Sequence, residues 1–168
     1  MSLIYGDDFL GKNYFPENSD RNFIGMFKKS MIVDSTGLVL PATTLTDNCY
    51  YEMFNGCTSL TTVPSNLLPV TTLKTHCYDS MFNGCTSLTI APELPATTLV
   101  DYCYQNMFNG CTSLNYIKCL ATDISATNCT QGWVAKVAST GTFVKNPNMT
   151  SWPTGDNGIP TGWTVQDA

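Results

Sequence analysis

One octamer, MFNGCTSL, occurs three times in this chain of 168 residues, at 53–60, 81–88 and 107–114. The shared blocks LP(A/V)TTL and CY precede each copy. In repeats of about 20–50 residues, a unit buries its apolar face against its neighbours. The sequence therefore predicts one stack of similar units around a single core.

Degenerate copies flank the three full units. Met26-Phe27 stands one repeat length before Met53-Phe54, and Trp133-Val134 stands one repeat length after Met107-Phe108. Terminal units of a stack are expected to differ, because their outer faces meet water.

The repeat divides the chain into three parts. We expect an N-terminal arm and cap at 1–24, the repeat region at 25–134 and a C-terminal cap at 135–168. The units of the repeat region lie near 25–52, 53–80, 81–106 and 107–134.

The segment CYxxMF of each unit predicts a short helix. Cys and Met are four positions apart, and so are Tyr and Phe, which on a helix gives an apolar stripe about 100° wide. Gly56, Gly84 and Gly110 follow this stripe, where a left-handed C-terminal cap is favoured. The C-T-S-L segment that comes next ends at Pro64 or Pro92 and predicts a short parallel strand. The fold class expected from these elements is an α/β repeat.

Positions shared by all copies should form the core, and the varying positions should face solvent. The expected core residues are Cys49, Met53, Phe54, Cys57, Leu60, Cys77, Met81, Phe82, Cys85, Leu88, Cys103, Met107, Phe108, Cys111, Leu114 and Trp133.

The aromatic residues, the Gly-Cys-Thr-Ser-Leu turn and the Pro-ended segment resemble the BspA-type leucine-rich repeats of Bacteroidetes. The resemblance covers about residues 25–135, and the tail that follows is similar to the C-terminal cap of many such proteins. It implies a leucine-rich-repeat solenoid of about five rungs, with short parallel strands and short helices and a cap at both ends. It also implies adhesion or recognition at the surface of these bacteria or on their phages.

The N-terminus differs from this family. A surface protein of this kind normally begins with an export segment, but MSLIYGDDFLGK has neither a basic region nor an apolar stretch typical of a signal peptide. We therefore expect a cell-surface, extracellular or virion location, with no signal peptide in the chain as given.

Eight cysteines leave two alternatives, a disulfide framework or buried free thiols. On a helix, Cys49 and Cys57 would be about 12 Å apart along the axis, beyond the reach of a bridge. Cysteines stacked about 4.8 Å apart on parallel rungs would also have poor geometry. We favour free thiols that act as small apolar side chains.

Composition argues against several classes of function. The net charge is −5 and the basic residues are dispersed, so no nucleic-acid partner is expected. No apolar run is long enough to cross a bilayer as a helix, so no membrane insertion is expected. The single histidine, His76, adjoins Cys77, but its slot varies between units, so we expect no catalytic residues, no metal and no cofactor.

Two further motifs have structural alternatives. Asp34-Ser35-Thr36 and Asp79-Ser80-Met81 match the glycosylation acceptor pattern of exported Bacteroidetes proteins, although chance matches are common. Trp133, Trp152 and Trp163 could offer a stacking platform for carbohydrate, but packing at the end of the stack is the favoured role.

The expected function is a non-catalytic recognition or adhesion module that binds a protein or a surface glycan. The alternative is a structural component of a phage virion, such as a decoration or a tail or fibre appendage. The sequence leaves the ligand and the oligomeric state open. The candidate ligand-binding residues are the varying strand positions Thr61, Thr89, Asn115, Tyr116 and Lys118.

Overall fold

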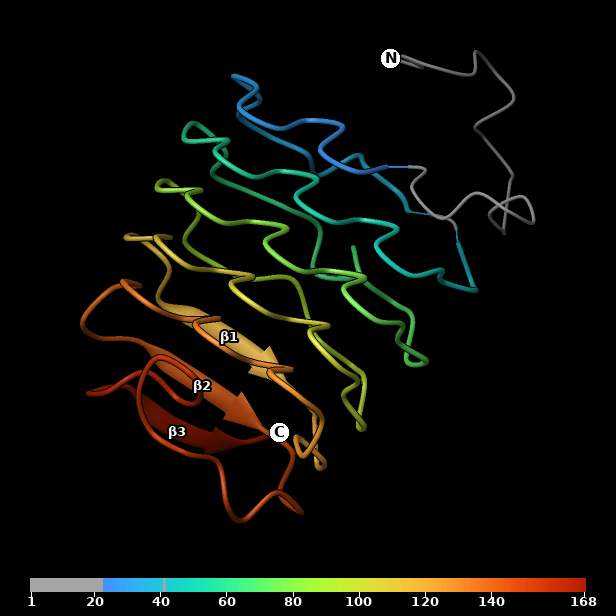
Figure 1. Cartoon of the computed structure of the whole chain (residues 1–168). Coiled ribbons are helices and arrows are strands. Elements are labelled where there is room, and N and C mark those ends of the chain that lie inside the picture. The colour runs from blue at the N-terminus through green and yellow to red at the C-terminus, as the bar shows by residue number, and fades with distance from the viewer. Residues whose placement is uncertain (1–22, 41) are drawn as a thin grey trace.

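The backbone winds into rungs that lie side by side along one axis (Figure 1). The computed structural model describes residues 23–40 and 42–168. Three strands, β1 (Tyr116–Cys119), β2 (Thr142–Lys145) and β3 (Thr164–Asp167), form one parallel sheet in the order β1-β2-β3. Two of these strands lie within 135–168, so this segment extends the sheet beyond the repeat units.

The expected α/β leucine-rich-repeat solenoid with short helices is wrong. Residues 23–40 and 42–168 contain no helix, and their regular strands are limited to these three. It follows that this part of the chain has no helix that could cross a membrane.

Each CYxxMF segment is a ribbon of overlapping turns. In the central unit, the N–H of Asp79 donates to the carbonyl of His76 at 3.3 Å, which closes a turn within the rung. The N–H of the next residue, Ser80, instead donates to the carbonyl of Gln105 in the following rung at 2.8 Å. The alternation recurs from unit to unit, and we call these stacked segments the turn ribbon. It comprises residues 23–30, 46–57, 74–85, 100–111 and 126–137.

Positive φ angles explain why the turn ribbon cannot be helical. In each full unit, a residue with φ between 50° and 76° recurs every four positions. Such a conformation brings the Cβ of an L-residue close to a carbonyl oxygen, so consecutive helical turns cannot contain it. These residues are Asn48, Glu52 and Gly56, then His76, Ser80 and Gly84, then Tyr102, Asn106 and Gly110. The turn ribbon repeats every four residues, and a helix repeats about every 3.6 residues. The two spacings are close, which is why CYxxMF suggested a helix.

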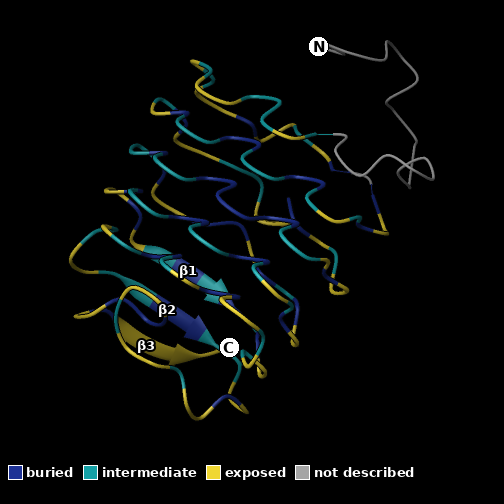
Figure 2. Ribbon diagram, in the orientation of Figure 1, coloured by how far each residue is buried: buried dark blue, intermediate teal, exposed yellow. Residues whose placement is uncertain are grey.

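Two columns of aromatic rings run through the core. Tyr50, Tyr78 and Tyr104 stack with ring centroids 5.8 and 6.1 Å apart. Phe54, Phe82 and Phe108 stack at 5.4 and 5.7 Å. Every residue expected in the core is buried, and the buried segments follow the inside of the rungs (Figure 2).

The opposite side of each rung becomes a regular strand only near the C-terminal end. In the second and third units this side carries Pro64 and Pro92, which have no N–H to donate to a neighbouring strand. The fourth unit has Lys118 at the same position, and there β1 forms. Earlier units meet through isolated parallel bridges, such as Asp34 with Thr62.

Candidate binding surface

The predicted ligand-binding residues lie on the strand side of the stack. Thr61, Thr89 and Asn115 are exposed on three successive units. The N–H of Asn115 donates to the carbonyl of Thr89 at 2.9 Å, so these two residues are direct neighbours on adjacent rungs. Thr61 lies one unit further along, and its hydroxyl donates to the carbonyl of Val33 at 3.0 Å.

The alternation of β1 places Tyr116 and Lys118 on its outer face. Both are half-buried, whereas Ile117 and Cys119 between them point into the core. Lys118 Nζ lies 3.2 Å from Glu93 Oε1 on the neighbouring rung. This ion pair neutralises the lysine, so the surface carries hydroxyl and aromatic groups rather than a concentrated charge.

Sequence reasoning missed one member of this surface, Ile90. Its side chain is 56% exposed, and it forms a parallel bridge with Tyr116. Tyr116 in turn pairs with Thr142, and Thr142 pairs with Thr164. We call Ile90, Tyr116, Thr142 and Thr164 the outer row. The sequence did contain a sign of this residue: Ile90 is an apolar residue at a repeat position that varies and that is Thr62 in the preceding unit.

Among the described residues, one cluster resembles a catalytic set, but its geometry is wrong for a nucleophile–base pair. His76 Nδ1 lies 2.8 Å from Asp79 Oδ2, and the hydroxyl of Ser80 donates to Asp79 Oδ1 at 2.8 Å. The carboxylate therefore stands between the serine and the histidine. A nucleophile–base pair requires the histidine to accept the serine proton directly.

All eight cysteines are free and buried. The thiols of one column donate to the carbonyl of a phenylalanine one unit earlier, as Cys85 does to Phe54 at 3.1 Å and Cys111 to Phe82 at 3.0 Å. Burial raises the pKa of Cys111 to about 12. It raises the pKa of Cys49, Cys103 and Cys119 to the same value. These thiols stay protonated near neutral pH and are poor nucleophiles.

The two glycosylation acceptor motifs and the tryptophans are built into the fold. Ser35 and Ser80 are 5% and 7% exposed, so neither hydroxyl is open to a transferase in the folded chain. Trp133 and Trp163 are buried, and Trp152 stacks on Trp133 at 5.6 Å. The tryptophans therefore pack at the C-terminal end of the stack, the role favoured from the sequence.

The described part of the chain contains no group of three or more His, Cys, Asp or Glu residues that could hold a metal ion. Comparisons with models of protein families, with curated proteins and with solved structures found no match.

Proposed function

We propose that this protein is a non-catalytic recognition module that binds a protein or a surface glycan through the outer row together with Asn115 and Lys118. The observation that carries the proposal is the exposed Ile90 beside the half-buried Tyr116, to which a backbone bridge joins it. A half-exposed isoleucine beside a tyrosine gives a small apolar centre, and the flanking Thr and Asn groups can form hydrogen bonds at its rim. The resemblance of the octamer to BspA-type repeats supports the same class of function.

The test uses the full chain against two probes, an array of defined glycans and intact Bacteroidetes cells. The double variant Ile90→Thr with Tyr116→Ala should weaken binding to the positive probe by about tenfold or more, the loss of one buried aromatic contact. Gln105→Ala, on the turn ribbon, is the matched control and should bind like the wild type. Equal binding by the double variant, or no binding of the wild type to either probe, contradicts the proposal.

A structural role in a phage virion is the second candidate. The observation that favours it is β3, whose four residues are all exposed at the edge of the parallel sheet. An exposed edge strand can pair with another chain. Light scattering separates the two functions. A virion component should form a defined multi-subunit species, whereas a recognition module can remain a monomer.

A further inference from the structure

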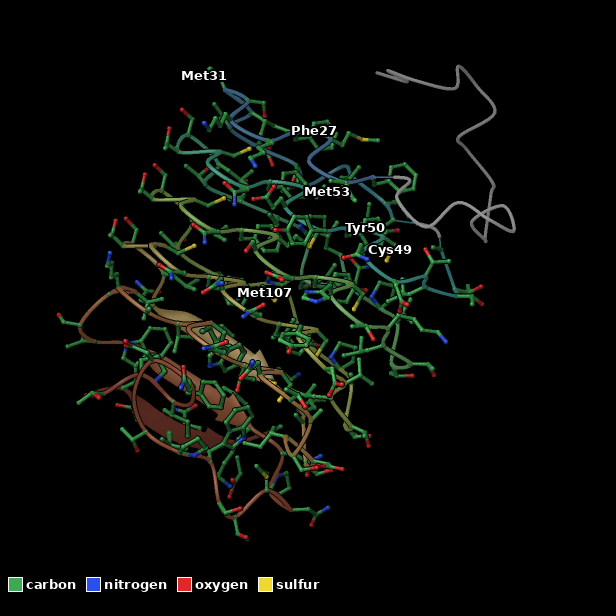
Figure 3. The ribbon with its side chains drawn as sticks, viewed as in Figure 1. Phe27, Met31, Cys49, Tyr50, Met53 and Met107 are labelled. Carbon is green, nitrogen blue, oxygen red and sulfur yellow. The ribbon has the colours of Figure 1, made fainter. Side chains whose placement is uncertain are left out.

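β3 leaves one edge of the parallel sheet open. The sheet runs in the order β1-β2-β3, and β3 lies at the end of the stack opposite to Met31 (Figure 3). Within 23–40 and 42–168, no strand or bridge pairs with the outer edge of β3. The backbone groups along such an edge are available for pairing with another chain.

The register of β3 shows which of its backbone groups are open. The N–H of Thr164 donates to the carbonyl of Gly141 at 2.9 Å. Successive residues of a strand direct their N–H and C=O groups to opposite sides. Thr164 and Gln166 therefore face β2, whereas Val165 and Asp167 face the open edge. Two donors and two acceptors are thus available within three consecutive residues.

The side chains of β3 do not protect this edge. Natural edge strands are commonly blocked by lysine, by proline or by a bulge. β3 has the sequence TVQD, and all four of its residues pair with β2 in continuous register, without a bulge. Its single charge, on Asp167, forms an ion pair with Lys145 of β2. Val165 pairs with the fully buried Phe143 but is itself 44% exposed. The edge is therefore nearly neutral and includes an exposed apolar residue.

We propose that β3 pairs with β3 of a second copy of the chain, antiparallel about a two-fold axis at Gln166. In this register Val165 lies opposite Asp167 of the second copy, and each such pair exchanges two N–H···O=C bonds. The two symmetric pairs use all the open backbone groups of Val165 and Asp167 on both strands. This self-complementarity is what a closed two-fold interface requires. The inference rests on the second candidate function, assembly with other subunits, and names the contact and the partner.

The side chains favour this register over its neighbours. Asp167 lies opposite a valine, and the two Gln166 side chains face each other, where their amides can form hydrogen bonds. A register centred on Asp167 would place two carboxylates directly opposite each other, which is destabilising. A register centred on Val165 would place Asp167 opposite Trp163, whose N–H already donates to Pro160. The carbonyl of Asp167 would then have no donor.

Two cysteine variants of the full chain test the contact directly. In the proposed register the two Gln166 Cα atoms lie about 4.5 Å apart, within the span of about 4.4–6.8 Å that a disulfide bridges. Gln166→Cys should therefore form a covalent dimer in oxidised glutathione. Thr164→Cys is the matched control, because Thr164 is exposed on the same face of β3. Its Cα atoms would be about 14 Å apart in the dimer, so it should not form one. The eight native cysteines are buried and do not compete.

Light scattering over about a hundredfold range of protein concentration measures association without a crosslink. The mass of the wild type should rise toward twice that of one chain. Val165→Pro removes an outward N–H that β2 does not use, and proline is tolerated at such an edge position, so this variant should fold and keep the mass of one chain. Val165→Ala retains the N–H and should still dimerise.

The possible failures can be told apart. A wild-type chain that stays monomeric at every concentration overturns both the inference and the assembly function. A larger species that forms without the Gln166→Cys crosslink, or that persists in folded Val165→Pro, overturns the inference alone, because the copies then join elsewhere. Equal crosslinking of the two cysteine variants also overturns it. If Val165→Pro does not fold, the two cysteine variants decide.

Discussion

At the scale of single residues, the positions with positive φ restrict which residue types the backbone accepts without strain. Gly56, Gly84 and Gly110 form a column with φ of 73–76°, and a Cβ added to Gly84 would lie 3.7 Å from the Cα of Gly56. Space is therefore adequate, and the cost of a side chain arises from the backbone conformation.

Gly84→Ala should lower the free energy of unfolding by about 1–2 kcal/mol, because alanine is strained at this φ. Gly37→Ala is the control, since Gly37 has no positive φ and a Cβ there would meet nothing within 4 Å. Urea denaturation measures both. Equal midpoints for the two variants would show that strain at Gly84 is unimportant.

The same column predicts a stabilising change. Lys136 follows Gly110 in this column and has φ of 63°. Lys136→Gly should raise the free energy of unfolding by about 0.5–1 kcal/mol. Glycine relieves the backbone strain at this φ, and this gain exceeds the cost of the extra conformational entropy that glycine has in the unfolded chain. Gln131→Gly, at a neighbouring residue without positive φ, should instead destabilise. A loss of stability in Lys136→Gly would refute this prediction.

At the scale of the repeating element, the aromatic columns connect the rungs. Phe82 is fully buried between Phe54 and Phe108, whereas Gln105 lies on the outer side of the turn ribbon and bonds to Gln131. The two positions therefore contrast the inside and the outside of the same element.

Phe82→Ala should cost about 3–5 kcal/mol, because it removes two ring contacts and leaves a cavity in the centre of the stack. Gln105→Ala should change stability by no more than about 0.5 kcal/mol. Denaturant midpoints of the two variants provide the measurement. Similar midpoints would mean that the inside and outside of the turn ribbon have been exchanged.

At the scale of the whole molecule, four buried thiols make stability depend on alkaline pH. The pKa of Cys49, Cys103, Cys111 and Cys119 rises from an ordinary value of 9.0 to about 12 through burial. Above pH 9 the unfolded chain loses these protons while the folded chain keeps them. The contribution of the thiols is thus complete below pH 9 and is lost as the pH rises toward 12.

The free energy of unfolding from urea denaturation should accordingly stay level between pH 7 and 8.5 and fall from pH 9 to 10, by up to about 1.4 kcal/mol per thiol. The range stops at pH 10 because burial also raises the pKa of Tyr50, Tyr78 and Tyr104 above the ordinary value of 10.0, so these side chains add a similar dependence at higher pH. Cys119→Ala should fall less steeply than the wild type. A midpoint that stays level to pH 10 would contradict the burial of the thiols.

Free thiols also predict a count. A thiol reagent under denaturing, non-reducing conditions should find eight reactive groups per chain, matching the eight free cysteines. Reductant should leave the melting temperature unchanged, whereas breaking a stabilising disulfide would cost about 2–4 kcal/mol. A count near zero on protein purified without oxidant would refute the free-thiol arrangement.

The sequence by itself determined the stacking of units and the residues that face the core, and it favoured, without deciding, the free cysteines that the structure shows. The exact copies of MFNGCTSL made these visible, because positions that contact a neighbouring copy must suit every copy. The exposure of Thr61, Thr89 and Asn115 followed from the same reasoning applied to varying positions.

Only the tertiary structure decided the path of the backbone. A helix and the turn ribbon both repeat near every fourth position, so the spacing of Tyr78 and Phe82 fits either. The choice between a helix and the turn ribbon depends on which group accepts the N–H of Ser80. The acceptor is the carbonyl of Gln105 in the next rung, about one repeat away in the sequence. A helix would satisfy that N–H locally, whereas the stack satisfies it between rungs and so tolerates a positive φ at every fourth residue. The same nonlocal pairing set Ile90 beside Tyr116, which is why the apolar centre of the outer row emerged only from the fold.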